Sequence, residues 1–136
     1  IFGVIMDKKL LKEKLKKLSV LFVDDEKLVI DTMKDILPML FDKTYFAADG
    51  YEGLNKYINN SPDVVITDLS MPHLDGLSMI RQIRRLNKET KVVCISGHNE
   101  QKSIEDCKSL DCGYIVKPIN SKILFEAFQD IVKPEY

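Results

Sequence analysis

Four apolar segments in this chain each end in side chains that can bind a metal ion or a phosphoryl group. The segments and their following residues are 20–23 with Asp24 and Asp25, 64–67 with Asp68, 92–95 with Ser96, and 113–116 with Lys117. If the segments are neighbouring parallel strands, these side chains meet at the carboxyl edge of one sheet, where open α/β sheets bind their ligands. Three carboxylates, a hydroxyl and an ammonium gathered there can hold a divalent metal and a phosphoryl group.

The three carboxylates have the chemistry of a Mg²⁺ site. Mg²⁺ takes oxygen ligands in near-octahedral geometry and commonly uses one or two carboxylates, waters and a phosphate oxygen. An alternative for Asp24 and Asp25 is that they only place negative charge at the start of the following helix. The metal site is the better interpretation, because Asp68 reaches the same edge.

Asp68 is the candidate nucleophile. A carboxylate oxygen that attacks a phosphoryl group forms an acyl phosphate. Lys117 would contact the phosphoryl oxygens as a point charge, and the Ser96 hydroxyl would donate a hydrogen bond to one of them. The alternatives are a solvated lysine at a strand end and a serine that serves only a turn or a helix cap.

Strands and helices alternate from residue 19 onward. Strands are expected at 19–24, 43–48, 63–67, 91–95 and 113–116, and helices at 26–40, 51–59, from Gly76 to about 87, 99–110 and 121–132. Pro38 should tighten or kink the last turn of the first of these helices. The third helix should bury Leu77, Ile80, Ile83 and Leu86.

These five strand–helix units predict an α/β fold. The strands are apolar almost throughout, which is typical of a parallel sheet covered on both faces. We expect a flavodoxin-like (βα)5 doubly wound sheet with strand order 2-1-3-4-5, which places the first and third strands side by side. Residues 19–132 would form this domain, residues 1–18 an N-terminal helical extension and residues 133–136 a C-terminal tail. Within the extension, 7–18 is a basic amphipathic helix that would pack on the domain or on a second copy of it.

Bulk properties exclude several classes of protein. The 136 residues suffice for one domain, and a net charge of −1 gives no reason to expect nucleic acid as a direct partner. The sequence contains no apolar stretch of the ~18 residues that span a bilayer, so we expect no membrane insertion. The three cysteines lack CxxC spacing and are interpreted as reduced packing residues of a cytoplasmic protein.

The motifs together resemble those of a response-regulator receiver domain, similar to the chemotaxis-type single-domain regulators of two-component signalling. The resemblance covers about residues 19–132 and rests on these residues in the family's order and spacing: Asp24, Asp25, Asp68, Met71, Pro72, Asp75, Gly76, Ser96, Tyr114, Lys117 and Pro118. The set is specific, although no single member would be.

The resemblance implies a role for each site residue. Asp68 would be the phosphorylation site, and Asp25, Asp68 and the carbonyl of Ser70 would bind Mg²⁺ directly, with Asp24 acting through a metal-bound water. Ser96 and Tyr114 would be the switch residues, and Lys117 would pair with the phosphoryl group. The Lys117–Pro118 bond should be cis. Ser96 replaces the commoner Thr, and Ser70 and His98 occupy variable positions that tune the phosphoryl lifetime.

The resemblance also implies partners. The phosphoryl donor would be a histidine kinase or a histidine phosphotransfer protein, and Ile30, expected to be exposed beside the site, would mark its docking face. Phosphorylation would switch a face made of 99–110, 113–116 and 121–132, with Phe125 in it, toward a downstream protein, an output domain or a homodimer. The chain would catalyse only its own phosphorylation and dephosphorylation.

Two rival functions use the same fold. One is an interaction module that does not depend on phosphorylation, against which the intact acidic site argues. The other is an aspartyl-phosphate phosphatase, which usually needs a second acid two residues after its nucleophile. Ser70 stands at that position.

Overall fold

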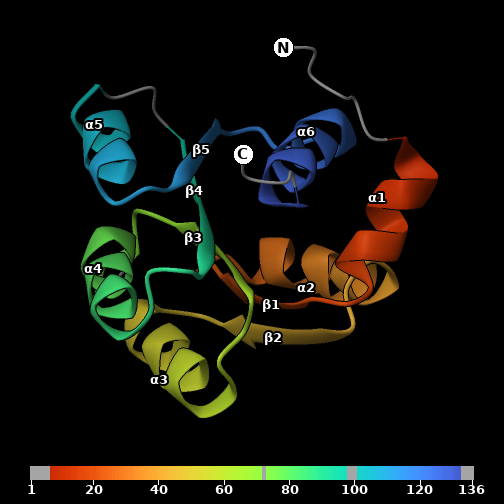
Figure 1. The fold of residues 1–136 in the computed structure, drawn as a ribbon. Helices are drawn as coiled ribbons and strands as arrows, with labels where there is room; N and C mark the ends of the chain where they lie inside the picture. The colour runs from red at the N-terminus through yellow and green to blue at the C-terminus, as the bar shows by residue number, and fades with distance from the viewer. Residues whose placement is uncertain (1–6, 72, 98–100, 133–136) are drawn as a thin grey trace.

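Five parallel strands form one sheet in the computed structural model, which describes residues 7–71, 73–97 and 101–132 (Figure 1). The strands are β1 (Ser19–Val23), β2 (Lys43–Ala47), β3 (Val64–Asp68), β4 (Lys91–Ser96) and β5 (Gly113–Val116). Their order is β2-β1-β3-β4-β5, as predicted. The central strand β3 is buried along its whole length, which explains its uninterrupted apolar sequence.

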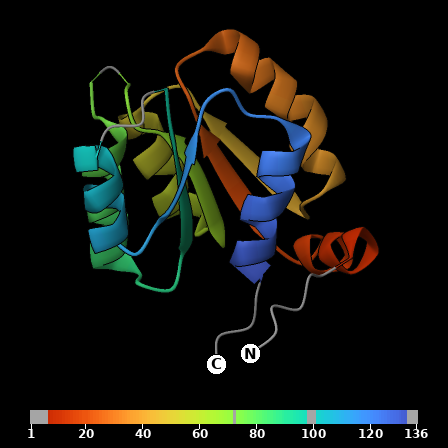
Figure 2. The same ribbon diagram turned by 90° about the horizontal axis from the view of Figure 1, so that it is seen from above.

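Helices cover both faces of the sheet. They are α1 (Lys8–Leu15), α2 (Lys27–Ile36), α3 (Gly50–Asn60), α4 (Gly76–Leu86), α5 (Gln101–Ser109) and α6 (Ser121–Val132). Helices α1, α2 and α6 lie on one side of the sheet, and α3, α4 and α5 lie on the other (Figure 2). The predicted helix at 99–110 is therefore seen as α5, and its first two residues lie outside the described residues.

The helix predicted at 26–40 ends earlier than its apolar pattern suggests. Its α-helical part stops at Ile36, and Leu37–Met39 form a turn of 3-10 helix with Pro38 inside it. A proline lacks the N–H that an α-helix would use at that point. The expected tightening at Pro38 is confirmed.

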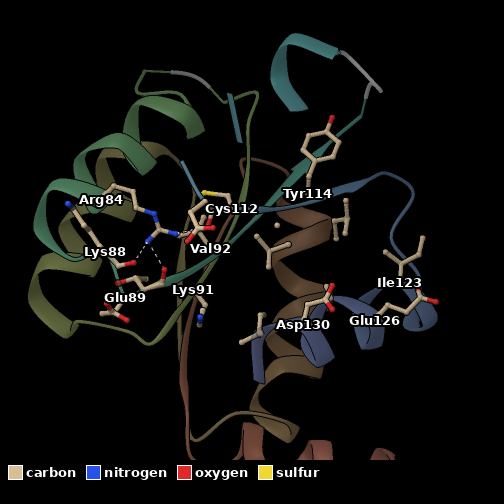
Figure 3. Close-up of a pocket in the computed structure, with 17 residues that line it drawn as sticks. Arg84, Lys88, Glu89, Lys91, Val92, Cys112, Tyr114, Ile123, Glu126 and Asp130 are labelled. Atoms are coloured by element: carbon tan, nitrogen blue, oxygen red, sulfur yellow. Dashed lines mark hydrogen bonds between the residues drawn. The ribbon is translucent and has the colours of Figure 1, made fainter. Parts of the chain in front are cut away.

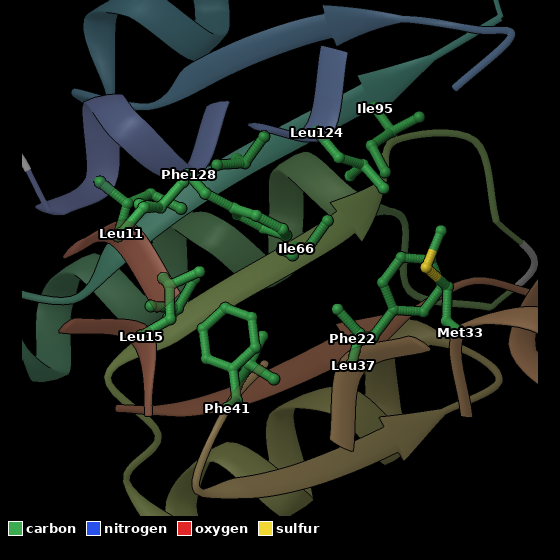
Figure 4. Packing of buried hydrophobic residues seen from close by; sticks show 14 residues of the cluster. Leu11, Leu15, Phe22, Met33, Leu37, Phe41, Ile66, Ile95, Leu124 and Phe128 are labelled. Carbon is green, nitrogen blue, oxygen red and sulfur yellow. The ribbon is translucent and has the colours of Figure 1, made fainter. Parts of the chain in front are cut away.

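The core consists of two apolar clusters, one on each face of the sheet. Figure 4 shows the first, in which side chains from β1, β3 and β4 meet those of α1, α2 and α6. Its aromatic centre is the edge-to-face pair of Phe41 and Phe128, whose ring centroids are 5.5 Å apart. Burial of the apolar side chains of both clusters supplies most of the favourable free energy of folding.

The N-terminal helix is part of this core. Leu11 and Leu15 are fully buried in the first cluster, α1 contacts α6, and Lys16 Nζ donates to the carbonyl of Pro38 at 3.2 Å. The first alternative for the extension, packing on its own domain, is therefore the one observed. Since Leu11 and Leu15 would be exposed without this contact, α1 helps to hold α6 on the sheet.

One part of the predicted core of α4 is wrong. Ile80 and Ile83 are buried, but Leu77 is only partly buried and Leu86 is 60% exposed, while Met79 is fully buried. The predicted apolar stripe is one turn too long, because Leu86, the last residue of α4, is exposed. No helix within the described ranges is long and apolar enough to cross a membrane.

Candidate functional site

The polar residues that follow the strands do meet at one edge of the sheet. Backbone hydrogen bonds extend beyond the paired strands there: Leu69 N donates to Ile95 O at 3.0 Å, and Lys117 N donates to Ser96 O at 2.8 Å. The backbone at the ends of β3, β4 and β5 is thus fixed in position. Side chains carried on fixed strand ends can be placed precisely.

Asp24, Asp25 and Asp68 form the predicted carboxylate cluster. One carboxylate oxygen from each lies within 4.8 Å of the other two. Asp24 and Asp68 are buried, at 0% and 3% exposure, whereas Asp25 is exposed. The cluster therefore opens to solvent on the side of Asp25.

Asp24 carries the clearest sign of a cation-binding site. Its Oδ1 accepts a hydrogen bond from Glu26 N at 2.9 Å, but its buried Oδ2 has no hydrogen-bond partner among the described residues. Burial raises the pKa of Asp24 from 3.8 to about 6, against the effect of the Glu26 hydrogen bond and with help from the charge of Asp68. A buried carboxylate oxygen without a partner is costly, and a divalent cation would satisfy it. The donor set is all oxygen and fits Mg²⁺.

Lys117 pairs directly with the candidate nucleophile. Its Nζ lies 3.0 Å from Asp68 Oδ2 and 3.4 Å from Glu26 Oε1. Partial burial lowers the pKa of Lys117, but the hydrogen bond to Asp68 and the nearby carboxylates outweigh it and hold that pKa above its ordinary value. Lys117 is therefore fully charged near neutral pH, and the peptide bond to Pro118 is cis, as expected.

The other predicted site residues surround this pair. Ser96 is the half-buried last residue of β4, Ser70 is exposed, and the Ser70 N–H donates to Asp68 Oδ1 at 3.1 Å. Tyr114 lies in β5, partly buried against the second core cluster. His98 and Pro72 lie outside the described residues.

Two residues at the site were not anticipated in these roles. Glu26 is a second partner for Lys117, and only the fold shows this, because the two are 91 residues apart. Gly76 lies so close to the end of β3 that an added Cβ would be 2.3 Å from the carbonyl oxygen of Asp68. The glycine that follows Asp75 therefore lets α4 begin directly against the loop that leaves Asp68.

A doubly wound parallel sheet with clustered carboxylates and a paired lysine at its carboxyl edge defines an α/β protein whose ligand site can hold a divalent cation and an anionic group. Comparison with known proteins narrows the class, because the family described as the response regulator receiver domain matches residues 20–129. The chain belongs to this family.

Individual relatives agree with this assignment. The chemotaxis protein CheY of Treponema pallidum is 33% identical over 118 residues, which is 84% of this chain and 82% of that protein. The structure of the CheX–CheY–BeF3–Mg²⁺ complex from Borrelia burgdorferi matches with a TM-score of 0.78 and 28% identity, over 84% of this chain and 88% of that chain.

A longer relative has the same domain as one of its parts. The uncharacterized transcriptional regulatory protein YesN of Bacillus subtilis is 27% identical over 84% of this chain, but the match covers only 32% of YesN. The chain thus spans about a third of that regulator and most of the CheY proteins. It is a signalling domain of two-component systems, a phosphoacceptor module of a family that binds Mg²⁺ at an acidic pocket and interacts with kinases and downstream targets.

Proposed function

We propose that Asp68 accepts a phosphoryl group from the phosphohistidine of a histidine kinase or a histidine phosphotransfer protein. The observation that carries this proposal is the 3.0 Å pair of Asp68 with Lys117, next to two further carboxylates at the same edge of the sheet. An oxygen of Asp68 forms a bond to phosphorus, and the bond from phosphorus to the donor imidazole nitrogen breaks, leaving its electron pair on the imidazole. Lys117 then moves its contact from the Asp68 carboxylate to the phosphoryl oxygens.

Mg²⁺ would be held by Asp24, Asp25 and Asp68 with the backbone carbonyl of Ser70. The similar structure from Borrelia burgdorferi is a CheX–CheY complex with BeF3 and Mg²⁺, which supports a magnesium site in this chain. When bound, the ion neutralises the negative charge of the carboxylates and of the incoming phosphoryl group. The chain's own contribution is to hold the Asp68 oxygen in place through the Ser70 N–H and to keep Lys117 charged beside it.

We expect Asp25→Ala to weaken Mg²⁺ binding more than Asp24→Ala. Asp25 is the exposed acid assigned as a direct ligand, and Asp24 is assigned to a bound water. Removing a group that only supports a metal ligand costs about 10- to 100-fold in affinity, so we expect about 100-fold for Asp25→Ala and about tenfold for Asp24→Ala. Isothermal titration with Mg²⁺ measures both, since the chain has no tryptophan to report binding. Equal or reversed losses would contradict the assignment.

Acyl phosphate formation is the direct test of the proposed function. The protein with Mg²⁺ and acetyl phosphate should gain one phosphoryl group that hydroxylamine removes, and chelation of Mg²⁺ should prevent the gain. A phosphatase would instead turn over small phosphate esters, and a module independent of phosphorylation would gain nothing. We propose no reaction of this domain other than its self-catalysed phosphorylation and the dephosphorylation that follows. We also propose that the domain is located in the cytoplasm.

The proposed docking face for the phosphoryl donor lies between α2 and the loop after β5. An apolar groove of 530 Å³ lies there beside Glu26 and Lys117, and its apolar lining is Leu28, Val29, Met33, Pro118 and Ile119. The expected marker of this face, Ile30, is half-buried against the core and lies instead beside β2. Leu28, which is 79% exposed, takes its place.

Leu28→Glu should slow phosphotransfer from the histidine donor about tenfold, while phosphorylation by acetyl phosphate stays unchanged. A tenfold effect corresponds to about 1.4 kcal/mol, so the prediction places Leu28 among the minority of interface residues that contribute more than about 1 kcal/mol. The matched control is Leu86→Glu, because Leu86 is also an exposed leucine in a helix but lies at the end of α4. Equal slowing with both phosphoryl donors would contradict docking at Leu28.

The proposed output face needs one revision. Phe125 is only partly exposed, because it packs on the first core cluster and the Lys8 ammonium of α1 lies 5.3 Å from its ring centroid. The surface of α5, β5 and α6 that remains accessible contains Glu126 and Asp130 instead. We propose that Ser96 and Tyr114 report the state of Asp68 to this surface, which binds a downstream protein, an output domain or a second copy.

A further inference from the structure

Glu26 is the outermost of three charged side chains that lead from the surface to the phosphoacceptor. Lys117 Nζ lies 3.0 Å from Asp68 Oδ2 and 3.4 Å from Glu26 Oε1, so one ammonium contacts both acids. The side chain of Asp68 is 4% exposed, that of Lys117 is 26% exposed and that of Glu26 is 59% exposed. A phosphoryl donor that approaches Asp68 past Lys117 therefore meets the carboxylate of Glu26 first.

The backbone of Glu26 is fixed, but its side chain has no role in the helix that it precedes. Its N–H donates to Asp24 Oδ1 at 2.9 Å, and its carbonyl accepts a hydrogen bond from Ile30 N at 3.1 Å. Glu26 is the N-cap residue of α2, yet its side chain makes no capping hydrogen bond, and glutamate is not among the residues preferred at that position. The backbone thus holds this carboxylate at the site, where it contacts Lys117.

Glu26 also lines the apolar groove between α2 and the loop after β5. Among the described residues that line this groove, Glu26 is the only acid and Lys117 is the only base. An aromatic ring suits the apolar lining, and a carboxylate at the rim suits a ring that carries an N–H donor. The imidazole of a phosphohistidine combines both properties.

A phosphorylated imidazole is a good donor while its second ring nitrogen carries a proton. Attack by an Asp68 oxygen on phosphorus breaks the P–N bond and leaves the electron pair on the ring nitrogen. If the second nitrogen is protonated, the ring keeps that proton and leaves as neutral imidazole; otherwise it would leave as an imidazolate anion. A carboxylate that accepts a hydrogen bond from the second N–H stabilises the protonated ring. The Glu26 carboxylate can accept this bond when Lys117 turns to the phosphoryl oxygens.

We propose that Glu26 selects phosphorylated imidazole rings as phosphoryl donors and disfavours anionic acyl phosphates. Acetyl phosphate offers no ring N–H, and its leaving group is an acetate anion, which the negative charge of Glu26 repels. This inference rests on the proposed phosphorylation of Asp68 and adds a preference between donors to it.

Monophosphoimidazole and acetyl phosphate test the preference, because both are small and neither needs a docking face. With Mg²⁺ present, the rate of adduct formation is followed by intact mass measurement. Glu26→Gln should react about fivefold more slowly with monophosphoimidazole and about fivefold faster with acetyl phosphate, which is the effect of one unit charge about 4 Å away in water. Glu26→Asp keeps the charge and should keep the slow reaction with acetyl phosphate.

The matched control is Glu89→Gln. Glu89 is also an exposed glutamate, but it lies before the start of β4, at the opposite edge of the sheet from Asp68, and lines a cavity of 660 Å³ beside Arg84 (Figure 3). Its substitution should change neither rate. Since the side chain of Glu26 is exposed, Glu26→Gln should fold, and melting by circular dichroism checks this.

The ratio of the monophosphoimidazole rate to the acetyl phosphate rate decides the proposal. A ratio that stays constant or rises in Glu26→Gln would overturn it. A wild type that gains no adduct from either donor would refute the phosphorylation of Asp68 and this inference with it. Adducts from both donors with a constant ratio would refute only the role of Glu26.

Discussion

Replacing Asp68 with Asn should abolish the phosphoryl adduct completely. The substitution keeps the size of the side chain and the oxygen that accepts the hydrogen bond from Ser70 N, but an amide is not a nucleophile toward phosphorus. It also removes the anion that Lys117 contacts at 3.0 Å. Incubation with Mg²⁺ and acetyl phosphate, followed by intact mass measurement under mild conditions, should show the adduct in the wild type and none in the variant.

A matched control for this prediction lies seven residues further along the chain. Asp75 is an acid near the same edge of the sheet, but its Oδ1 caps α4 by accepting a hydrogen bond from Ser78 N at 2.8 Å. Because asparagine caps helices about as well as aspartate, Asp75→Asn should fold and be phosphorylated normally. A wild-type level of adduct in Asp68→Asn would contradict the assignment of the phosphoacceptor.

Much of the fold could be predicted because strands that are buried on both faces consist of consecutive apolar residues. The apolar runs that end at Val23, Thr67 and Ile95 lie in the three inner strands, where both faces are covered. The polar residues directly after these strands must then lie at one edge of the sheet. The carboxylate cluster could therefore be predicted from the order of the strands. The resemblance to receiver domains named the same residues independently.

Other features depend on distances that no local pattern contains. The contact between Glu26 and Lys117 joins two residues that are 91 positions apart in the sequence. Phe125 is partly exposed, as its helical position predicts, but its neighbour Lys8 belongs to α1, and the docking of α1 is a tertiary contact. The close approach of Gly76 to the Asp68 carbonyl is likewise visible only when α4 is placed on the sheet.

The raised pKa of Asp24 makes the stability of the metal-free protein depend on pH. Its value of about 6 in the folded state lies above its ordinary 3.8, so between these values the folded state holds a proton that the unfolded state has released. Stability from this group is therefore greatest below about pH 4, falls as the pH rises to about 6 and stays low above that. A shift of this size costs about 3 kcal/mol at neutral pH, at 1.36 kcal/mol per pKa unit.

Asp24→Asn should therefore stabilise the metal-free fold by about 2 to 3 kcal/mol at pH 8 and change it little near pH 4. The amide oxygen can still accept the hydrogen bond from Glu26 N, while the buried charge beside Asp68 is gone.

Urea unfolding of both proteins in chelator, at several pH values, measures the difference. Asp35→Asn, at an exposed position of α2, is the matched control and should not show it. Addition of Mg²⁺ should stabilise the wild type by mass action, and it should stabilise the Asp24→Asn variant less. The metal should therefore reduce the difference in free energy of unfolding between the two proteins. A difference that is the same at pH 4 and pH 8 would show that the buried charge of Asp24 is not its cause.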